Sequence, residues 1–355
     1  MTSPTSATPC ARRSRPWRWR SALAVTLLLA FYLLPWLRWN GRQALLFDLA
    51  ARRFDLFGLT LWPHDAGVLL GLMAMLATAL ALLSHLAGRG WCGHGCPQTL
   101  WSRAFGWIED GIARRVRPAA LARVLTQAAW ALLALWTGIT FVGVFSPIHG
   151  LLAGVPALRW SAWETFWVLF YAAATWGNAG FLREQVCRTL CPFARMQPLL
   201  TDPWTPRMQY DPRRGEPRGA RPAGAGGVVT RGRGLLDATT AQDYAFRAAH
   251  PLLAGPMPRF ADDRLGDYTD CGQCAAACPM QLDIRHGPQA DCLACGACVD
   301  ACADEQHRVG FGTALVRYGS PQVLSGQARR YARPRTMALL GLLLALLMLG
   351  AWQLG

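Results

Sequence analysis

Five long apolar segments constrain this chain more than any other feature of its sequence. They lie at residues 21–37, 66–87, 124–145, 162–182 and 337–354. A helix needs about 20 apolar residues to cross the hydrocarbon core of a bilayer, because it rises about 1.5 Å per residue. The composition points the same way, since 52% of the residues are hydrophobic and only 16% are charged. The sequence therefore predicts a mainly α polytopic membrane protein with five transmembrane helices.

The basic residues are all arginine, and their distribution predicts the orientation of the chain. Of the 36 arginines, 31 fall in the N-terminal tail, the 88–123 loop and the 183–336 segment. Cytoplasmic segments of membrane proteins carry the excess of Lys and Arg. We therefore expect a bacterial inner-membrane protein with a cytoplasmic N-terminus and a periplasmic C-terminus. This distribution also explains the net charge of +15 without nucleic-acid binding, which a basic surface otherwise suggests.

Seven of the twelve cysteines form two runs that resemble the C-x2-C-x2-C-x3-C-P pattern of bacterial ferredoxins. The second run lacks only the proline and consists of Cys292, Cys295, Cys298 and Cys302. The first run consists of Cys271, Cys274 and Cys278, followed by Pro279. Tyr268 stands where its first cysteine belongs. The pattern predicts a twin-cluster module in which one thiolate is missing.

In this pattern three cysteines of a run bind one cluster and the fourth binds the other. Cluster two, a 4Fe-4S cluster, is then expected on Cys278, Cys292, Cys295 and Cys298. Cluster one is left with Cys271, Cys274, Cys302 and Tyr268. It is either a 4Fe-4S cluster with an oxygen ligand, a 3Fe-4S cluster or a poorly filled site. Zinc also binds C-x2-C pairs, but it does not require the interlocked spacing of these runs, and iron-sulfur clusters that transfer single electrons are the favoured interpretation.

Four further cysteines form two C-x3-C-P motifs, each at the end of an apolar hairpin. They are Cys92, Cys96, Cys187 and Cys191. On a continuous helix, residues four apart lie on one face, so each pair is expected to present two sulfurs to one ion. Soft thiolates favour Cu(I), which makes copper a candidate ligand and His94 an additional candidate donor. The alternative is that these are inert thiols packed as small hydrophobic groups.

These features divide the chain into five predicted parts. They are a disordered cytoplasmic basic tail at 1–20, a four-helix membrane domain at 21–182, a cytoplasmic connector with a Gly/Pro/Arg-rich linker at 183–266, a ferredoxin-like α+β module at 267–320, and a connector with the fifth helix at 321–355. The linker has too few large apolar residues to offset the entropy of ordering. The module is therefore expected between helices four and five, on the cytoplasmic side.

Several longer motifs carry a resemblance to a known family. They are FDLAARRFDLFGLTLWPHD, GRGWCGHGCPQTLW, REQVCRTLCPFARMQ, YDPRRGEPRG and DIRHGPQADCLACGACVDAC. Over about residues 38–345 the chain resembles the cytochrome c oxidase accessory proteins, the CcoG/FixG/RdxA group. It departs from the family pattern at Tyr268, in a longer 219–266 linker, and in ending at Gly355, where family members commonly continue into a periplasmic immunoglobulin-like domain.

The resemblance implies a membrane iron-sulfur protein that is needed to assemble cbb3-type oxidases. It further implies reduction of Cu(II) to Cu(I), with copper at the four cysteines of the C-x3-C-P motifs. The expected partners are the membrane, cbb3-type oxidase assembly factors or a copper transporter, and a cytoplasmic or quinol electron donor. No nucleic-acid partner is expected.

Two other functions remain as alternatives. One is a quinol dehydrogenase-type subunit that feeds a periplasmic reductase, since such subunits also combine C-x3-C-P motifs with ferredoxin runs. The apolar segment after the cysteine runs and the YDPRRGEPRG motif argue against it. The other is a non-catalytic iron-sulfur scaffold or redox sensor, whose clusters only stabilise the fold.

Overall fold

The computed structural model describes residues 15–49, 51–154, 160–221, 224, 236–250, 264–324 and 326–354. The chain divides into two compact units, which we describe separately. The membrane unit consists of Ala22–Leu82, His94–Ala194 and Arg333–Gly355. The cysteine-rich unit consists of Met1–Ser21, Leu83–Gly93 and Arg195–Ala332. The predicted tail is described only from residue 15 onwards, and Cys10 lies outside the described residues.

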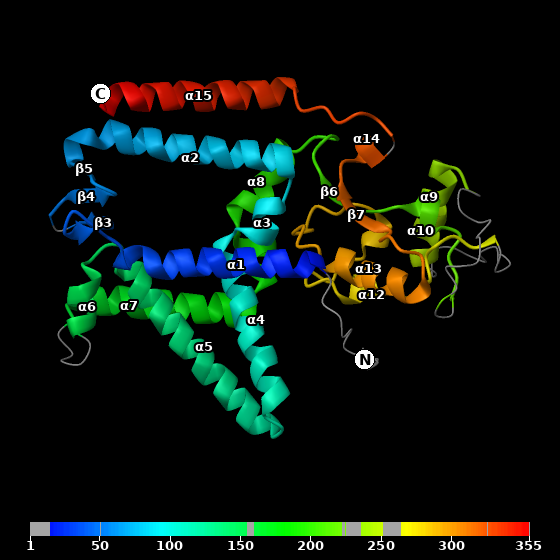
Figure 1. Cartoon of the computed structure of the whole chain (residues 1–355), viewed down its shortest axis with the longest axis horizontal. Coiled ribbons are helices and arrows are strands. Elements are labelled where there is room, and N and C mark those ends of the chain that lie inside the picture. Colours follow the sequence, from blue (N-terminus) through cyan, green and yellow to red (C-terminus); the bar gives the residue numbers. More distant parts are fainter. Residues whose placement is uncertain are drawn as a thin grey trace. The chain divides into compact units, whose positions relative to one another are not determined.

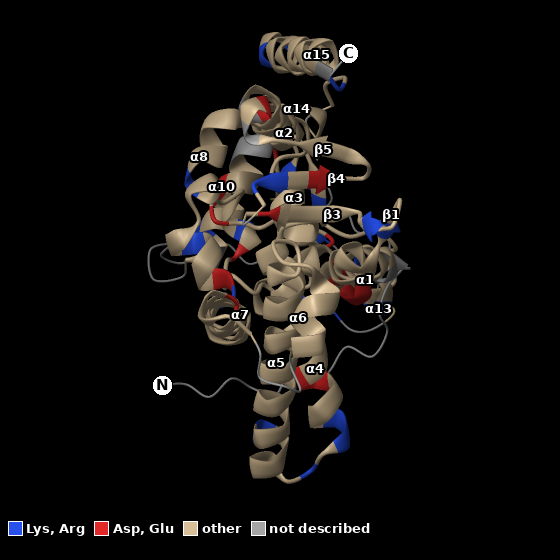
Figure 2. Cartoon of the chain, turned by 90° about the vertical axis from the view of Figure 1, so that its left-hand side faces the viewer, with Lys and Arg blue, Asp and Glu red and all other residues tan. Residues whose placement is uncertain are grey.

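Long helices dominate the membrane unit (Figure 1). They and the shorter α6 are α1 (Arg15–Leu33), α2 (Ala66–Ala87), α4 (Pro97–Arg115), α5 (Ala119–Val142), α6 (Ile148–Gly154), α7 (Ala162–Thr175) and α15 (Pro334–Leu354). Four stretches in the described part are long and apolar enough to cross a membrane, namely Trp19–Trp36, Gly67–Ala87, Ala119–Val142 and Pro334–Gln353. Figure 2 shows charged residues at the turn between α4 and α5, where α4 ends with Arg114 and Arg115.

The fifth predicted span, residues 162–182, is not confirmed. There the α-helix α7 has only 14 residues and continues as a π-helix, η3 (Trp176–Leu182). An α-helix of this length rises about 21 Å, whereas the hydrocarbon core is about 30 Å thick. The described chain therefore has four candidate spans where the sequence predicted five. Single π-turns within helices are often found at functional sites, and η3 leads directly towards the second C-x3-C-P motif.

Two kinds of contact hold the membrane unit together. Helices α5 and α7 approach closely at Gly138, where an added Cβ would stand 2.5 Å from the carbonyl oxygen of Val168. Small residues allow such approach between membrane helices. The indole Nε1 of Trp101 donates to the hydroxyl groups of Tyr32 and Thr137, both at 3.2 Å. This polar cluster joins α1, α4 and α5, as side-chain hydrogen bonds do between helices in lipid.

The first loop of the membrane unit contains small antiparallel sheets that the sequence analysis did not predict. Strand β1 (Arg38–Trp39) pairs with β2 (Arg42–Gln43). Strands β3 (Leu45–Asp48), β4 (Arg53–Leu56) and β5 (Leu59–Leu61) form a meander, with Phe47 opposite Phe54. Within β4 the carboxylate of Asp55 is buried and accepts hydrogen bonds from Arg53 and Thr60.

Short elements make up the cysteine-rich unit. They are α3 (Gly90–His94), α8 (Pro192–Leu200), β6 (Arg207–Tyr210), α9 (Pro212–Gly215), α10 (Ala238–Ala249), α12 (Gln273–Ala276), the 3-10 turn η7 (Ile284–His286), α13 (Ala297–Val309), β7 (Val316–Gly319) and α14 (Pro321–Leu324). Strands β6 and β7 pair antiparallel, with Tyr210 opposite Val316. Met208 and Tyr210 pack in one core with Tyr268, Cys274 and Cys302. The core thus includes residues before the predicted start of the module at 267.

The 183–266 segment differs in part from the predicted connector and linker. It contributes β6, α9 and α10 to the cysteine-rich unit, and Ala245 of α10 is fully buried in the unit's core. The reason is that β6 finds a strand partner in β7, which lies more than a hundred residues later in the chain. The remaining linker residues, 222–223, 225–235 and 251–263, lie outside the described residues.

Candidate iron-sulfur and thiol sites

Both ferredoxin runs use the same local structure. Cys271 and Cys295 are each followed by a glycine in the left-handed region, with φ of 64° at Gly272 and 82° at Gly296. These glycines are the N-caps of α12 and α13, and each helix carries the next cysteine of its run. Glycine adopts such φ values without steric cost. The backbone therefore turns sharply between two cysteines and brings their side chains to the same side.

One group of thiols lies around Cys298 and includes two cysteines from the other run, Cys274 and Cys278. Burial raises the pKa of Cys298, and the thiols of Cys295, Cys292, Cys274 and Cys278 raise it further. Burial also raises the pKa of Cys292, to which Cys295 and Cys278 add. Buried thiols in this proximity are costly to ionise unless a cation is bound, so the donor set fits a metal cluster.

A second group of thiols lies deeper in the unit. Cys274 and Cys302 are 3% and 6% exposed. Burial raises the pKa of Cys274 to about 12, and Cys302 and Cys271 add to this effect. The backbone N–H of Leu315 donates to the Cys302 sulfur at 3.3 Å, and that of Ala294 donates to the Cys292 sulfur at 3.5 Å. Hydrogen bonds to sulfur are one of the factors that set the reduction potential of a cluster.

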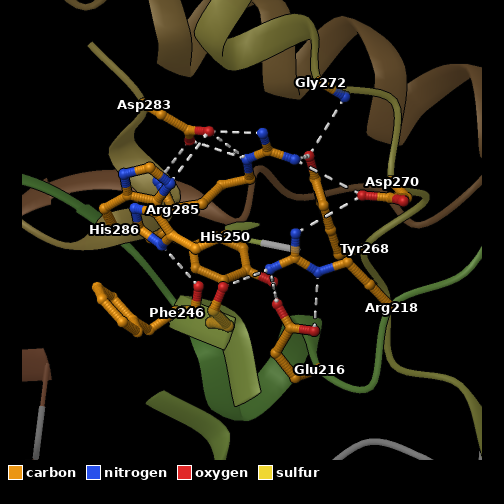
Figure 3. Close-up of polar contacts among 12 residues, drawn as sticks. Glu216, Arg218, Phe246, His250, Tyr268, Asp270, Gly272, Asp283, Arg285 and His286 are labelled. Carbon is orange, nitrogen blue, oxygen red and sulfur yellow. Dashed lines mark hydrogen bonds and ion pairs between the residues drawn. The ribbon is translucent and has the colours of Figure 1, made fainter. Parts of the chain in front are cut away.

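Tyr268 lies beside the second group, buried to 3% exposure. Its hydroxyl oxygen accepts hydrogen bonds from the Gly272 N–H at 3.2 Å and from Nη1 of Arg285 at 3.4 Å (Figure 3). Burial raises the pKa of Tyr268, and the thiols of Cys274 and Cys271 raise it further, whereas Arg285 lowers it. The side chain that replaces a cysteine is therefore held in place by two donors at its oxygen.

Two arginines position Tyr268 in this site (Figure 3). Arg285 forms a two-point ion pair with Asp283, with its Nε 2.8 Å from Oδ1. The guanidinium of Arg218 lies over the tyrosine ring, 5.2 Å from its centroid, and pairs with the fully buried Glu216 at 2.8 Å. The sequence analysis did not identify these residues as parts of the site. In the sequence, these residues could have been found as pairs of opposite charge two positions apart, Asp283 with Arg285 in DIRHG and Glu216 with Arg218 in EPRG.

The structure corrects the expected geometry of the C-x3-C-P motifs, because neither motif is a continuous helix. Helix α3 ends at His94, and Cys96 is the extended N-cap of α4, with ψ of 131°. Cys187 lies in the π-helix η4 (Val186–Leu190), and Cys191 is its extended C-cap, with ψ of 111°. The residue before a proline is disfavoured in the helical region, so Pro97 and Pro192 break the helices. The assumption of two sulfurs on one helix face is therefore wrong.

Cys96 of the first motif and Cys191 of the second nevertheless lie near enough for their thiols to interact electrostatically. Burial raises the pKa of Cys96, the backbone N–H groups of Gln98 and Thr99 lower it, and the nearby thiol of Cys191 raises it. The Gln98 side chain donates to the carbonyl oxygens of Asn178 and Arg183, both at 3.0 Å. These bonds tie the start of α4 to the end of η3. Both cysteines thus directly precede a helix that begins with proline, α4 for Cys96 and α8 for Cys191.

Cys92 has a different environment from Cys96. Its buried thiol donates to the side-chain oxygen of Gln197 at 3.6 Å. The Gln197 amide donates in turn to the carbonyl oxygen of Gly88 at 3.0 Å. In the residues that the structure describes, no group of three or more His, Cys, Asp and Glu side chains could hold a single metal ion, and this applies to the thiols of the ferredoxin runs as well as to Cys187, His94, Cys96 and Cys191. An iron-sulfur cluster distributes its thiolates over several irons, so the ligands of a cluster need not converge on one ion.

Comparison with known proteins places these sites in a family. A model described as "4Fe-4S dicluster domain" matches residues 182–233 and 257–321. Protein RdxA of Cereibacter sphaeroides is 36% identical over 315 residues, which are 83% of this chain and 58% of the relative. Nitrogen fixation protein FixG of Rhizobium meliloti is 32% identical over 329 residues, 87% of this chain and 55% of the relative.

A third relative, protein RdxB of Cereibacter sphaeroides, is 33% identical over 315 residues, which are 83% of this chain and 58% of the relative. The chain thus spans between 55% and 58% of the length of the curated relatives it matches. No solved structure matches it. With 32% to 36% identity to these relatives over most of its length, the chain belongs to the RdxA/FixG family and carries a 4Fe-4S dicluster domain.

Proposed function

We propose that this protein is an electron-transfer protein that reduces Cu(II) to Cu(I) during the biogenesis of a cbb3-type cytochrome c oxidase. The observation that carries the proposal is that Cys96 and Cys191, one from each motif, lie near enough for their thiols to interact electrostatically, each directly before a helix that begins with proline. Two thiols at the starts of helices, in a chain with a 4Fe-4S dicluster domain, combine a soft donor set with a source of single electrons. Copper is the substrate in this proposal.

The proposed cluster ligands follow the two groups of thiols described above. Cluster two would be held by Cys278, Cys292, Cys295 and Cys298. Cluster one would be held by Cys271, Cys274 and Cys302, with Tyr268 in the fourth place. When bound, these clusters supply one-electron transfer. The residues around them hold the thiols in place, donate hydrogen bonds to sulfur and bury the site from water.

A close contact supports a connection between the first C-x3-C-P motif and cluster two. Helix α3 carries Cys92 and Gly93 and lies against the loop between Cys292 and Cys295. An added Cβ at Gly93 would stand 2.6 Å from the carbonyl oxygen of Leu293 and 2.8 Å from that of Ala294. The motif segment and the cluster loop therefore touch through backbone atoms, which gives electrons a short route between them.

The remaining parts of the proposal concern location and partners. We place the N-terminus and the clusters on the cytoplasmic side of the inner membrane and the C-terminus in the periplasm, because of the arginine distribution. The proposed partners are oxidase assembly factors or a copper transporter that receives Cu(I).

Comparison of two double variants tests whether Cys96 and Cys191, rather than Cys92 and Cys187, form the copper site. The pair variant carries Cys96→Ser and Cys191→Ser, and the matched control carries Cys92→Ser and Cys187→Ser. After anaerobic purification, iron and bound Cu(I) are counted, and reduction of Cu(II) by dithionite-reduced protein is measured. We expect the pair variant to lose Cu(I) binding and Cu(II) reduction with unchanged iron, and the control to retain most of both.

Equal loss in both double variants would reject the Cys96–Cys191 pair as the copper site. Full retention of Cu(I) binding and reduction in the pair variant would reject copper chemistry at these thiols altogether. Failure of the wild-type protein to reduce Cu(II) would reject the reductase proposal and favour the scaffold or sensor alternative. The iron count separates each of these outcomes from a general loss of the fold.

A further inference from the structure

A cavity of about 250 Å³ lies within the cysteine-rich unit and has no role in the sites described so far. Its wall comes from three segments, namely Gly88–Arg89 after α2, the stretch from Gln197 to Met208, and the loop from Pro288 to Ala294. The last segment includes Cys292, a proposed ligand of cluster two. A molecule in this cavity would therefore lie directly beside that cluster.

The cavity also begins where a membrane span ends. Gly88 and Arg89 directly follow the candidate span Gly67–Ala87. This part of the wall therefore lies within two residues of the end of a candidate span. This location favours a lipid-soluble ligand over a soluble one.

The wall combines apolar surface with a few polar side chains, whose amide and hydroxyl groups already donate to the carbonyl oxygens of Gly88 and His85. The apolar part is formed mainly by prolines and a methionine, namely Pro198, Pro206, Pro288 and Met208. The polar part includes the fully buried Gln197 and Thr205, which is 1% exposed. Mostly apolar walls with a few placed polar groups are typical of sites for small organic molecules.

Charge and size narrow the class of ligand. Arg89 and Arg207 line the cavity and disfavour a cation. Cavities for drug-sized ligands have about 300–1,000 Å³. This one is slightly smaller, so it suits one substituted ring with oxygen atoms and excludes a dinucleotide.

We infer that this cavity binds the ring of a membrane quinol and is the place where electrons enter the protein. The inference rests on the proposed function, because it assumes that the cluster module accepts the electrons from the quinol. Oxidation of one quinol to the quinone breaks two O–H bonds and releases two protons to water and two electrons. Clusters held by the two cysteine runs would accept these electrons one at a time, and reduction of two Cu(II) ions to two Cu(I) ions would balance the oxidation.

Binding of decylubiquinone to the oxidised, cluster-loaded full chain in nanodiscs tests the inference without relying on activity. Ala290 is exposed at the cavity wall, so Ala290→Trp fills the cavity from the surface. Ala332→Trp is the matched control, because Ala332 is also exposed but does not line the cavity. By calorimetry we expect Ala290→Trp to weaken binding at least tenfold and Ala332→Trp to leave it unchanged, with equal iron contents.

Equal affinity of the Ala290→Trp variant and the wild type, or no binding by the wild type, would overturn the inference. So would binding of inorganic phosphate that displaces decylubiquinone at similar concentration, since the two arginines would then form an anion site. The proposed function fails separately. If dithionite-reduced protein reduces Cu(II) but binds no quinone, only the inference is lost. If quinone binds and Cu(II) is not reduced, only the copper proposal is lost.

Discussion

Gly93→Ala gives the sharpest test of the contact between α3 and the cluster loop. The added Cβ would stand 2.6 Å from the Leu293 carbonyl oxygen and 2.8 Å from that of Ala294, whereas ordinary contact begins at 3.4 Å. The helix and the loop must therefore separate by about 0.8 Å. Overpacking of this kind costs about 1–3 kcal/mol. Because about 1.4 kcal/mol corresponds to a factor of ten, the loop should open roughly 5- to 150-fold more often.

Amide hydrogen exchange of peptides that cover residues 288–296 measures this opening directly, because exchange reports local unfolding. We expect faster exchange there by the factor given above and little change in α5. The Cβ of Gly93 would not meet a backbone restriction of its own, since Gly93 is not among the glycines with positive φ. The effect would thus come from the contact with the loop.

Gly106→Ala is the matched control. Gly106 lies within α4, and an added Cβ would meet nothing within 4 Å. Alanine is favoured over glycine in a helix by up to about 1 kcal/mol, so this change should leave exchange at residues 288–296 unaltered. Unchanged exchange in Gly93→Ala, or the same increase in both variants, would refute the inferred contact.

Two further predictions concern Tyr268 and its neighbours. Tyr268→Cys should raise the iron content per protein and change the low-temperature EPR spectrum, because it restores the missing thiolate. The control Tyr268→Phe should leave the iron content unchanged. An unchanged iron content and an unchanged spectrum in Tyr268→Cys would contradict this prediction. Burial alone would raise the pKa of Asp283, but the hydrogen bonds and charge of Arg285 outweigh burial, and the pKa is lowered. The ion pair therefore stabilises the folded unit above about pH 4, the ordinary pKa of an aspartate. This stabilisation is lost as the pH falls through the lowered pKa. Asp283→Asn should therefore bleach the clusters faster at pH 7, measured by visible absorbance, and the difference from the wild type should shrink below about pH 4; a constant difference would argue against the ion pair.

The sequence by itself determined the class of protein, because hydrophobic periodicity and ligand spacing are local properties. Four of the five apolar segments correspond to candidate spans, and the cysteine runs agree with the dicluster domain that the family comparison identifies. The assignment of individual cysteines to clusters, the orientation and copper binding remain predictions. The replacement at Tyr268 was also visible, since it is one position in a fixed pattern.

Only the tertiary structure decided which side chains from distant segments meet. The proximity of Cys96 and Cys191 depends on the packing of two distant segments, whereas Pro97 and Pro192 already indicated in the sequence that each motif is interrupted. Arg285 and Arg218 reach Tyr268 from different segments. Spacing along the chain specifies contacts over one or two helical turns, but contacts between distant segments depend on the packing of the whole unit, which no local pattern encodes.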